Sequence, residues 1–145
     1  MANKQVTVAT IKEMKQKGEP ITMITAYDVA MSRNVNEAGV DMILVGDSLG
    51  NVILGYNSTV PVTMDEMIHH TKAVMRGNST ALVVGDMPFM SYNLTVEQGL
   101  ENASKMIKAG ASGVKLEGCN EHILKLVRRC VESGIPVLGH LGFTP

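Results

Sequence analysis

Short apolar runs alternate with helical segments along the chain, and this alternation constrains the fold more than any other feature. Several predicted helices end at a glycine that directly precedes the next apolar run, at Gly39, Gly110 and Gly134. Glycine readily adopts the left-handed conformation that ends a helix and lets the chain turn back. Strict strand–helix alternation is typical of a parallel sheet, so the sequence predicts an α/β fold.

The predicted elements follow one another without a composition break, which favours one domain over residues 1–145. Predicted strands cover residues 21–27, 40–46, 80–85, 113–116 and 135–139. Predicted helices cover residues 8–17, 29–38, 64–75, 96–109 and 121–133, with Thr63 and Thr95 as N-caps and Glu66 completing a capping box. Residues 48–63 are rich in Gly, Asn, Ser and Thr and are predicted to form a long loop.

Polar residues follow every predicted strand, which favours a barrel over a doubly wound sheet. A dinucleotide-binding sheet would carry Gly-x-Gly-x-x-Gly after its first strand, where this chain has Ala26, Tyr27 and Asp28. A (β/α)8 TIM barrel instead spreads functional residues around its ring, but it needs roughly 250 residues. The sequence therefore predicts about the first five strands of a (β/α)8 barrel, as a single incomplete domain.

Three carboxylates stand directly after predicted strands and form the first candidate site. Asp47 and Asp86 each follow a strand that ends in glycine, and Glu117 follows the fourth strand. Carboxyl ends of parallel strands converge on one mouth, where such folds place their chemistry. Three oxygen ligands without a Cys or paired His suit Mg²⁺ better than Zn²⁺. The sequence predicts a divalent-metal site here, although a single strand-end Asp is more often a helix N-cap than a metal ligand.

Lys115 and His140 are the two basic candidates at the same mouth. Lys115 lies within a short apolar run, where an unpaired charge would be costly. It either pairs with one of the acids or serves as the counter-charge of a substrate carboxylate or enolate. His140 ends the fifth strand and either faces the mouth or has a structural role, whereas His122 is expected on a helix surface.

The residues around Ser48 suggest a second possible reaction, ester hydrolysis. Residues 46–50 match the Gly-Asp-Ser-Leu motif that carries the nucleophilic serine of one esterase family. The sequence Gly118-Cys119-Asn120 could supply an oxyanion element. That family also needs Asp-x-x-His for its base, and this pattern does not occur in the chain. The motif also follows the second strand rather than the first, so the esterase remains a minor alternative.

The composition of the chain indicates which classes of partner it can bind. The net charge of −1 shows no excess of positive charge of the kind that binds nucleic acid or anionic membranes. Cys119 and Cys130 have no metal or redox spacing, which favours reduced thiols. The N-terminus lacks the apolar stretch of a signal peptide, and no apolar run reaches the ~18–20 residues that span a membrane. A soluble cytoplasmic protein that binds neither nucleic acid nor membrane is expected.

Six ordered stretches together resemble the ketopantoate hydroxymethyltransferase (3-methyl-2-oxobutanoate hydroxymethyltransferase) family. They are ITAYD at 24–28, VGDSLG at 45–50, STVPVT at 58–63, DMPFMSY at 86–92, VKLEG at 114–118 and GHLGFTP at 139–145. No single stretch is decisive, but the ordered set is specific. The resemblance covers the chain nearly end to end and matches the N-terminal portion of the family.

The resemblance implies Mg²⁺ at Asp47, Asp86 and Glu117, and a 2-oxo acid at Asp47, Ser48, Asp86 and Lys115; His140 is a further substrate-binding candidate because its place at the end of the fifth strand faces the same mouth. It implies hydroxymethyl transfer from 5,10-methylenetetrahydrofolate to 3-methyl-2-oxobutanoate, giving 2-dehydropantoate, in a homo-oligomer that is often a decamer. The family's proton acceptor is a Glu beyond Pro145, so the isolated chain is expected to turn over poorly. Two alternatives remain: a Mg²⁺-dependent 2-oxo-acid lyase or aldolase of the phosphoenolpyruvate-mutase type, and an inactive barrel fragment that needs a partner.

Overall fold

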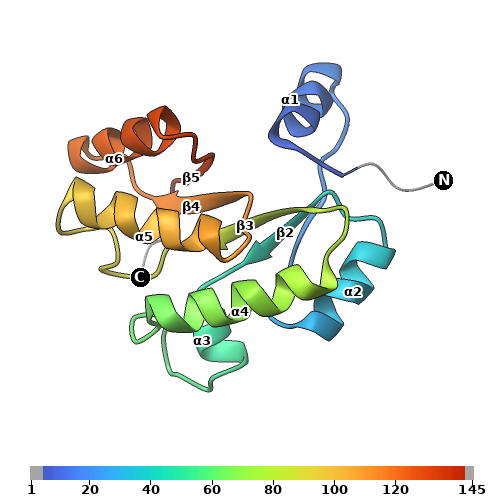
Figure 1. The fold of residues 1–145 in the computed structure, drawn as a ribbon, viewed down its shortest axis with the longest axis horizontal. Helices are drawn as coiled ribbons and strands as arrows, with labels where there is room; N and C mark the ends of the chain where they lie inside the picture. The colour runs from blue at the N-terminus through green and yellow to red at the C-terminus, as the bar shows by residue number, and fades with distance from the viewer. Residues whose placement is uncertain (1–4, 143–145) are drawn as a thin grey trace.

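The computed structural model describes residues 5–142 and shows strands and helices in regular alternation (Figure 1). The strands are β1 (Met23–Thr25), β2 (Met42–Val45), β3 (Leu82–Asp86), β4 (Gly113–Glu117) and β5 (Val137–His140). The helices are α1 (Val8–Lys17), α2 (Val29–Glu37), α3 (Leu49–Val52), α4 (Met64–Gly77), α5 (Val96–Lys108) and α6 (Glu121–Glu132). The last three residues of the stretch 139–145 lie outside the described residues.

The five strands form one parallel sheet in the order β1-β2-β3-β4-β5. This order never reverses, so the sheet has no switch point of the kind that doubly wound folds use. Within residues 5–142, β1 pairs only with β2 and β5 only with β4, so both edges of the sheet are open. The predicted α/β fold with five consecutive parallel strands is confirmed.

One face of the sheet packs against α2, α4, α5 and α6 and holds the main core (Figure 1). Alternate strand residues such as Ile43, Val83 and Val114 point to this face and are fully buried. Met106 and Leu126 meet them from α5 and α6 and are equally buried. The helices therefore cover the outside of the sheet, as expected for successive right-handed β–α–β units.

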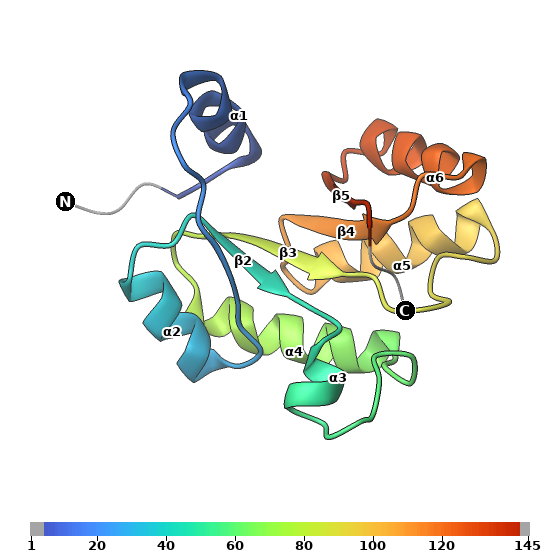
Figure 2. The same ribbon diagram turned by 180° about the vertical axis from the view of Figure 1, so that it is seen from behind.

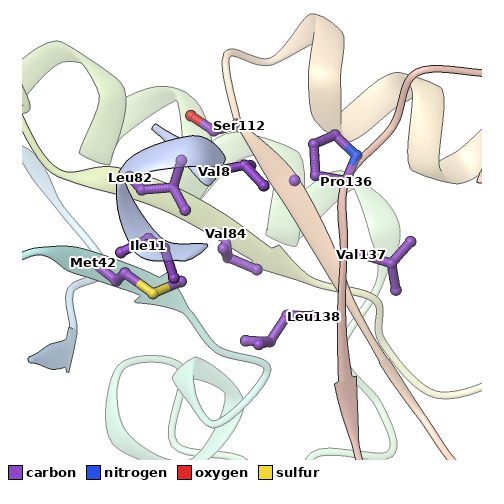
Figure 3. Close-up of a pocket in the computed structure, with 10 residues that line it drawn as sticks. Val8, Ile11, Met42, Leu82, Val84, Ser112, Pro136, Val137 and Leu138 are labelled. Carbon is purple, nitrogen blue, oxygen red and sulfur yellow. The ribbon is translucent and has the colours of Figure 1, made fainter. Parts of the chain in front are cut away.

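The other face of the sheet is covered at one end by α1, which stands apart from the other helices (Figure 2). Val8 and Ile11 of α1 pack towards the intervening strand residues Met42, Leu82 and Val84. A small cavity of about 110 Å³ remains between them, as Figure 3 shows. The side chains that line this cavity are almost entirely apolar, and α1 covers this end of the sheet although none of its own residues is fully buried.

Local capping chemistry explains where the helices begin. Thr63 accepts a hydrogen bond from the Glu66 N–H, and the Glu66 carboxylate accepts one from the Thr63 N–H, so the predicted capping box is confirmed. Thr95 caps α5 as predicted. Gly39 and Gly134 have φ values of 77° and 79°, the left-handed conformation expected after a helix.

The loop prediction for residues 48–63 is wrong at its start, where α3 forms a single helical turn. Glycine is needed in this turn, because a Cβ added at Gly50 would lie 2.5 Å from the Val62 side chain. Four of the strands begin two residues later than predicted, whereas β4 begins where predicted. The first two strands end earlier than predicted, and β3, β4 and β5 each run one residue further. No helix within residues 5–142 is long and apolar enough to cross a membrane.

Candidate active site at the carboxyl ends of the strands

The sheet face that α1 covers at one end carries charged side chains at its other end, where the strands have their carboxyl ends. Residues two apart in a strand share a face, so Asp86 lies on the same face as Leu82 and Val84. The strand register pairs Asp86 with Lys115 and Glu117 with His140. Four of the sequence-predicted site residues, from three neighbouring strands, therefore meet at one mouth of the sheet.

Lys115 is the centre of this cluster. Its Nζ donates to Asp86 Oδ1 and Oδ2 at 3.0 and 2.9 Å and to Glu117 Oε1 at 2.7 Å. The lysine side chain is only 12% exposed, and those of Asp86 and Glu117 are 4% and 15% exposed. Of the two alternatives for Lys115, the structure shows the ion pair, and Lys115 forms it with two acids rather than one.

Glu117 has two further contacts that hold it in place. His140 Nδ1 lies 2.8 Å from the carboxylate oxygen Oε1, and the Glu117 N–H donates to the Tyr92 hydroxyl at 3.3 Å. Burial by itself raises the pKa of Glu117, but the hydrogen bonds from Lys115 and His140 outweigh it, and the pKa lies below its ordinary value. Glu117 is therefore a well-compensated anion.

Asp86 and Asp47 are less well compensated. Burial raises the pKa of Asp86 to about 6, although the charge and hydrogen bonds of Lys115 oppose the shift. Burial also raises the pKa of Asp47, against opposing effects of Lys115 and of a hydrogen bond from Thr59. The two residues are neighbours, since the Asp47 N–H lies 3.4 Å from Asp86 Oδ2. This side of the mouth can accommodate more positive charge than Lys115 alone provides.

Ser48 is held by Tyr27 at the edge of the same mouth. The Tyr27 hydroxyl and Ser48 Oγ are 2.8 Å apart, and the Tyr27 carbonyl oxygen lies 2.7 Å from His70 Nδ1 on α4. Within residues 5–142 no histidine contacts the Ser48 hydroxyl, so the general base that an esterase nucleophile requires is not in place. The structure therefore gives the esterase alternative no support.

The charges of the cluster test whether its residues suit a divalent cation. Three carboxylates (Asp47, Asp86, Glu117) and one ammonium (Lys115) leave a net charge of 1 − 3 = −2 when all are ionised. All the candidate ligand atoms are oxygens, which suits Mg²⁺. Within the described residues, however, no three His, Cys, Asp or Glu side chains are arranged to hold a metal ion, and Lys115 Nζ contacts both Asp86 and Glu117. The charge fits a divalent ion, and the ligand set remains a proposal.

Three contributors to the site were not assigned by sequence reasoning. Tyr92 supplies the hydroxyl behind Glu117, and Thr59 reaches Asp47 from the loop before α4. His122 was expected on a helix surface, and that expectation is corrected: it is partly buried, and its Nε2 donates to the Tyr92 carbonyl oxygen at 2.9 Å. No local sequence pattern predicts these contacts, because each joins segments that are far apart in the chain.

Comparison with known proteins places the chain in a family. The ketopantoate hydroxymethyltransferase family model matches residues 5–145. The chain belongs to the ketopantoate hydroxymethyltransferase family. It is 57% identical over 143 residues to the 3-methyl-2-oxobutanoate hydroxymethyltransferase of Syntrophus aciditrophicus (strain SB), covering 98% of this chain and 52% of that relative. The chain thus spans about half the length of the curated relatives it matches.

Solved structures share the fold of this family member at low sequence identity. A phosphonopyruvate hydrolase in complex with oxalate and Mg²⁺ aligns with a TM-score of 0.75 and 11% identity, over 90% of this chain and 50% of that one. A phosphoenolpyruvate phosphomutase from Streptomyces platensis subsp. rosaceus aligns with a TM-score of 0.74 and 13% identity, over 93% and 53%. Both belong to a superfamily of (β/α)8 barrels, and the chain corresponds to about half of such a barrel.

Proposed function

We propose that this chain provides the 2-oxo-acid side of a Mg²⁺-dependent ketopantoate hydroxymethyltransferase. The reaction transfers a hydroxymethyl group from 5,10-methylenetetrahydrofolate to 3-methyl-2-oxobutanoate and gives 2-dehydropantoate. Family membership supports the assignment. The observation that carries it is the buried cluster in which Lys115 contacts both Asp86 and Glu117, at the strand ends where barrels place their chemistry.

Lys115 acts as the electrostatic group of this proposal. A 2-oxo acid presents a carboxylate and a carbonyl oxygen, and removal of a proton from the adjacent carbon places negative charge on the carbonyl oxygen. An ammonium held at a fixed position stabilises that charge without reorganising during the reaction. The hydrogen bonds to Asp86 and Glu117 hold Nζ in such a position.

Asp47 and Asp86 are the residues best placed to hold Mg²⁺, with Glu117 as the third proposed ligand. Mg²⁺ commonly uses one or two protein carboxylates and completes its shell with water or substrate oxygens. A bound Mg²⁺ supplies Lewis-acid polarisation of the substrate carbonyl. Burial keeps Asp86 short of compensating charge, which favours cation binding at this side.

Ser48 and His140 complete the proposed substrate contacts. Ser48 can donate its hydroxyl to a substrate oxygen when Tyr27 donates to Ser48 Oγ. His140 is 41% exposed at its side chain and lies at the solvent side of Glu117, where a substrate would approach. The proton acceptor is not assigned to a residue of this chain.

We propose a cytoplasmic homo-oligomer that acts on a small molecule and binds neither nucleic acid nor membranes. The near-neutral net charge and the family resemblance support this proposal.

Calorimetric titration of 3-methyl-2-oxobutanoate into the purified chain, in Mg²⁺ and in EDTA, tests the proposed function. We expect binding that depends on Mg²⁺ and that Asp86→Asn weakens at least tenfold, because the amide removes one anionic ligand while keeping the side-chain shape. Asp65→Asn on the exposed side of α4 is the matched control and should bind like the parent. Equal affinity in EDTA would remove the metal from the proposal, and no binding in either buffer would overturn it.

The lyase alternative shares the metal and the 2-oxo acid but needs no folate. Its solved relatives show only the fold, since they are 11–13% identical to this chain, whereas the hydroxymethyltransferase relatives are 52–58% identical. Cleavage or rearrangement of a 2-oxo acid by the chain in the absence of any folate would favour the lyase alternative.

A further inference from the structure

Two tyrosines at the carboxyl edge of the sheet are held in the same way, and each contacts a residue of the proposed site. Tyr27 follows β1, and its hydroxyl lies 2.8 Å from Oγ of Ser48, a residue that follows β2. Its carbonyl oxygen accepts a hydrogen bond from Nδ1 of His70 at 2.7 Å, and His70 lies on α4, the long helix after β2. The neighbouring β–α unit therefore holds Tyr27 both at its hydroxyl and at its backbone.

Tyr92 repeats this arrangement two strands further on. It lies in the loop after β3, and its hydroxyl accepts from the N–H of Glu117, at the end of β4, at 3.3 Å. Its carbonyl oxygen accepts from Nε2 of His122 at 2.9 Å, and His122 lies on α6, the helix after β4. In both cases a tyrosine after one strand contacts the end of the next strand and a histidine on the helix that follows it. We call the pair His70 and Tyr27 the first His–Tyr clamp, and the pair His122 and Tyr92 the second.

Both tyrosines are part of the packed core. Tyr27 and Tyr92 are 6% and 5% exposed and belong to the main core between the sheet and its helices. A side chain in a close-packed core is restricted to few rotamers, so each hydroxyl has a defined position. The two histidines are partly buried. The packing of α4 and α6 on the outer face of the sheet therefore sets where the two hydroxyl groups lie.

The second clamp lies where pairing between β3 and β4 ends. The register of these strands ends at Lys115, two residues before Glu117. The Gly118 N–H donates to the His140 carbonyl oxygen on the β5 side at 3.0 Å. Successive N–H groups of a strand point to opposite neighbours, so the Glu117 N–H points to the β3 side. There the Tyr92 hydroxyl takes the place of a strand acceptor, and it fixes the backbone that carries the Glu117 carboxylate.

The two clamps hold residues on opposite sides of the charged cluster. Ser48 follows β2 and Glu117 ends β4, whereas Asp86 ends β3, the strand between them. A binding site for a small molecule needs its groups within about 0.5 Å of the productive geometry, and supporting contacts provide this precision. Each clamp supplies such a contact from a helix that itself contributes no proposed ligand.

We propose that the two His–Tyr clamps are positioning devices: the first fixes Ser48 for the 2-oxo acid, and the second fixes Glu117 for Mg²⁺. The inference rests on the proposed function, in which Ser48 and Glu117 have these roles. His70 and His122 act only through the tyrosines. Loss of either histidine therefore leaves every proposed ligand in the chain but lets one of them move, so each clamp affects the affinity for a different ligand.

Two calorimetric titrations of the purified chain, with Mg²⁺ alone and with 3-methyl-2-oxobutanoate at saturating Mg²⁺, test the clamps separately. His70→Leu should weaken 2-oxo-acid binding at least threefold and leave Mg²⁺ affinity within twofold of the parent. His122→Leu should weaken Mg²⁺ binding at least threefold and leave 2-oxo-acid affinity at saturating Mg²⁺ within twofold.

Matched variants separate the hydrogen bond from the rest of the imidazole ring. The amide NH₂ of Asn lies near the position of Nδ1, and that of Gln lies near the position of Nε2. His70→Asn and His122→Gln each keep a donor for the tyrosine carbonyl oxygen and should restore the affinity that the leucine variants lose.

Hydrogen exchange of the Glu117 amide tests the second clamp without any ligand. Tyr92→Phe keeps the ring and removes only the hydroxyl, so we expect this amide to exchange at least fivefold faster. His122→Leu should act in the same direction, and His122→Gln should not. Tyr56→Phe is the control, because it removes a hydroxyl that donates to Glu66 away from the cluster.

Three results would overturn the inference. The first is that the leucine variants bind both compounds like the parent, and the second is that the Asn and Gln variants lose as much affinity as the leucine variants. The third is an unchanged exchange rate of the Glu117 amide in Tyr92→Phe, which would remove the second clamp. If the folded parent binds no 2-oxo acid, the proposed function fails, and the exchange rates still decide whether His122 and Tyr92 fix Glu117.

Discussion

The two ends of one sheet face differ sharply in chemistry. At the end covered by α1 this face presents Met42, Leu82 and Val84, which pack around a small apolar cavity (Figure 3). At the other end it presents Asp86, Lys115, Glu117 and His140. Along β3 alone, the side chains change from Leu82 through Val84 to Asp86 within five residues.

This difference shows that one end of the sheet stabilises the fold and the other end carries the reactive side chains. The apolar end gains free energy from burial and needs no partner outside the protein. The charged end has a net charge of 1 − 3 = −2 when Asp47, Asp86, Glu117 and Lys115 are all ionised, and burial raises the pKa of Asp86. A cationic ligand would therefore stabilise this end. In parallel barrels the carboxyl end of the strands is the catalytic end.

The strongest test of the charged end is Lys115→Met, which leaves Asp86 and Glu117 buried without their cation. Removing one partner from a buried ion pair typically costs 3–5 kcal/mol, so we expect a loss of about 3 kcal/mol in the free energy of unfolding. Urea denaturation at pH 7 measures the loss, and 2-oxo-acid binding should disappear as well. Lys125→Met removes an exposed pair with Glu121 on α6 and should change stability by no more than about 0.5 kcal/mol. An unchanged midpoint for Lys115→Met would contradict the structure of the cluster.

The pH dependence of stability should reveal the raised pKa of Asp86. Its folded-state pKa of about 6 lies above the ordinary value of 3.8, so the folded state binds the proton more tightly than the unfolded state. The resulting stabilisation is fully present below about pH 4 and is lost as the pH rises through about 6. At 1.36 kcal/mol for each pKa unit, the change is about 3 kcal/mol.

Asp86→Asn cannot titrate and should remove this pH dependence. Denaturation between pH 4 and pH 8 in EDTA, compared with Asp65→Asn, measures the difference. Added Mg²⁺ should reduce the slope in the parent chain, because a cation favours the ionised carboxylate. Identical slopes for the parent chain and Asp86→Asn would contradict the prediction.

The apolar end can be tested with Leu82→Ala. Truncation of a buried leucine costs about 2–5 kcal/mol, and we expect a loss near the lower limit, about 2 kcal/mol, because Leu82 already borders a cavity. Leu126→Ala in the main core, where the leucine is fully buried, should cost more. Binding of 3-methyl-2-oxobutanoate to Leu82→Ala should match the parent in calorimetry. If Leu82→Ala folds but no longer binds the 2-oxo acid, the apolar end and the charged end of the sheet are energetically coupled.

The smallest effect is expected from Tyr27→Phe, which removes only the hydroxyl that contacts Ser48. A hydrogen bond of this kind contributes about 1 kcal/mol, so 2-oxo-acid affinity should fall roughly fivefold with little change in stability. Tyr56→Phe removes another hydroxyl, which donates to Glu66 away from the cluster, and should leave affinity unchanged. If Tyr27→Phe weakens binding equally in a Ser48→Ala background, Tyr27 does not act through Ser48.

Patterns that repeat locally were predicted well from the sequence. Alternating apolar runs and glycine-ended helices are set by hydrogen bonding and burial over a few residues. The five strands and five of the six helices that residues 5–142 form follow from them, as does the capping box at Thr63. The short helix α3 was missed because its polar, glycine-rich sequence favours a loop. It forms where Gly50 packs against Val62 and Tyr56, which no local propensity describes.

The sequence by itself determined that carboxylates would gather at one end of a parallel sheet, since strand direction and two-residue alternation place them there. Only the tertiary structure decided how they are compensated. Lys115 could have paired with either acid or with neither, and the register of β3, β4 and β5 brings it between both. The contacts of Tyr27 with Ser48 and of His122 with Tyr92 likewise join distant segments. Such contacts depend on distances of a few ångströms between elements, and the packing of the whole chain sets those distances.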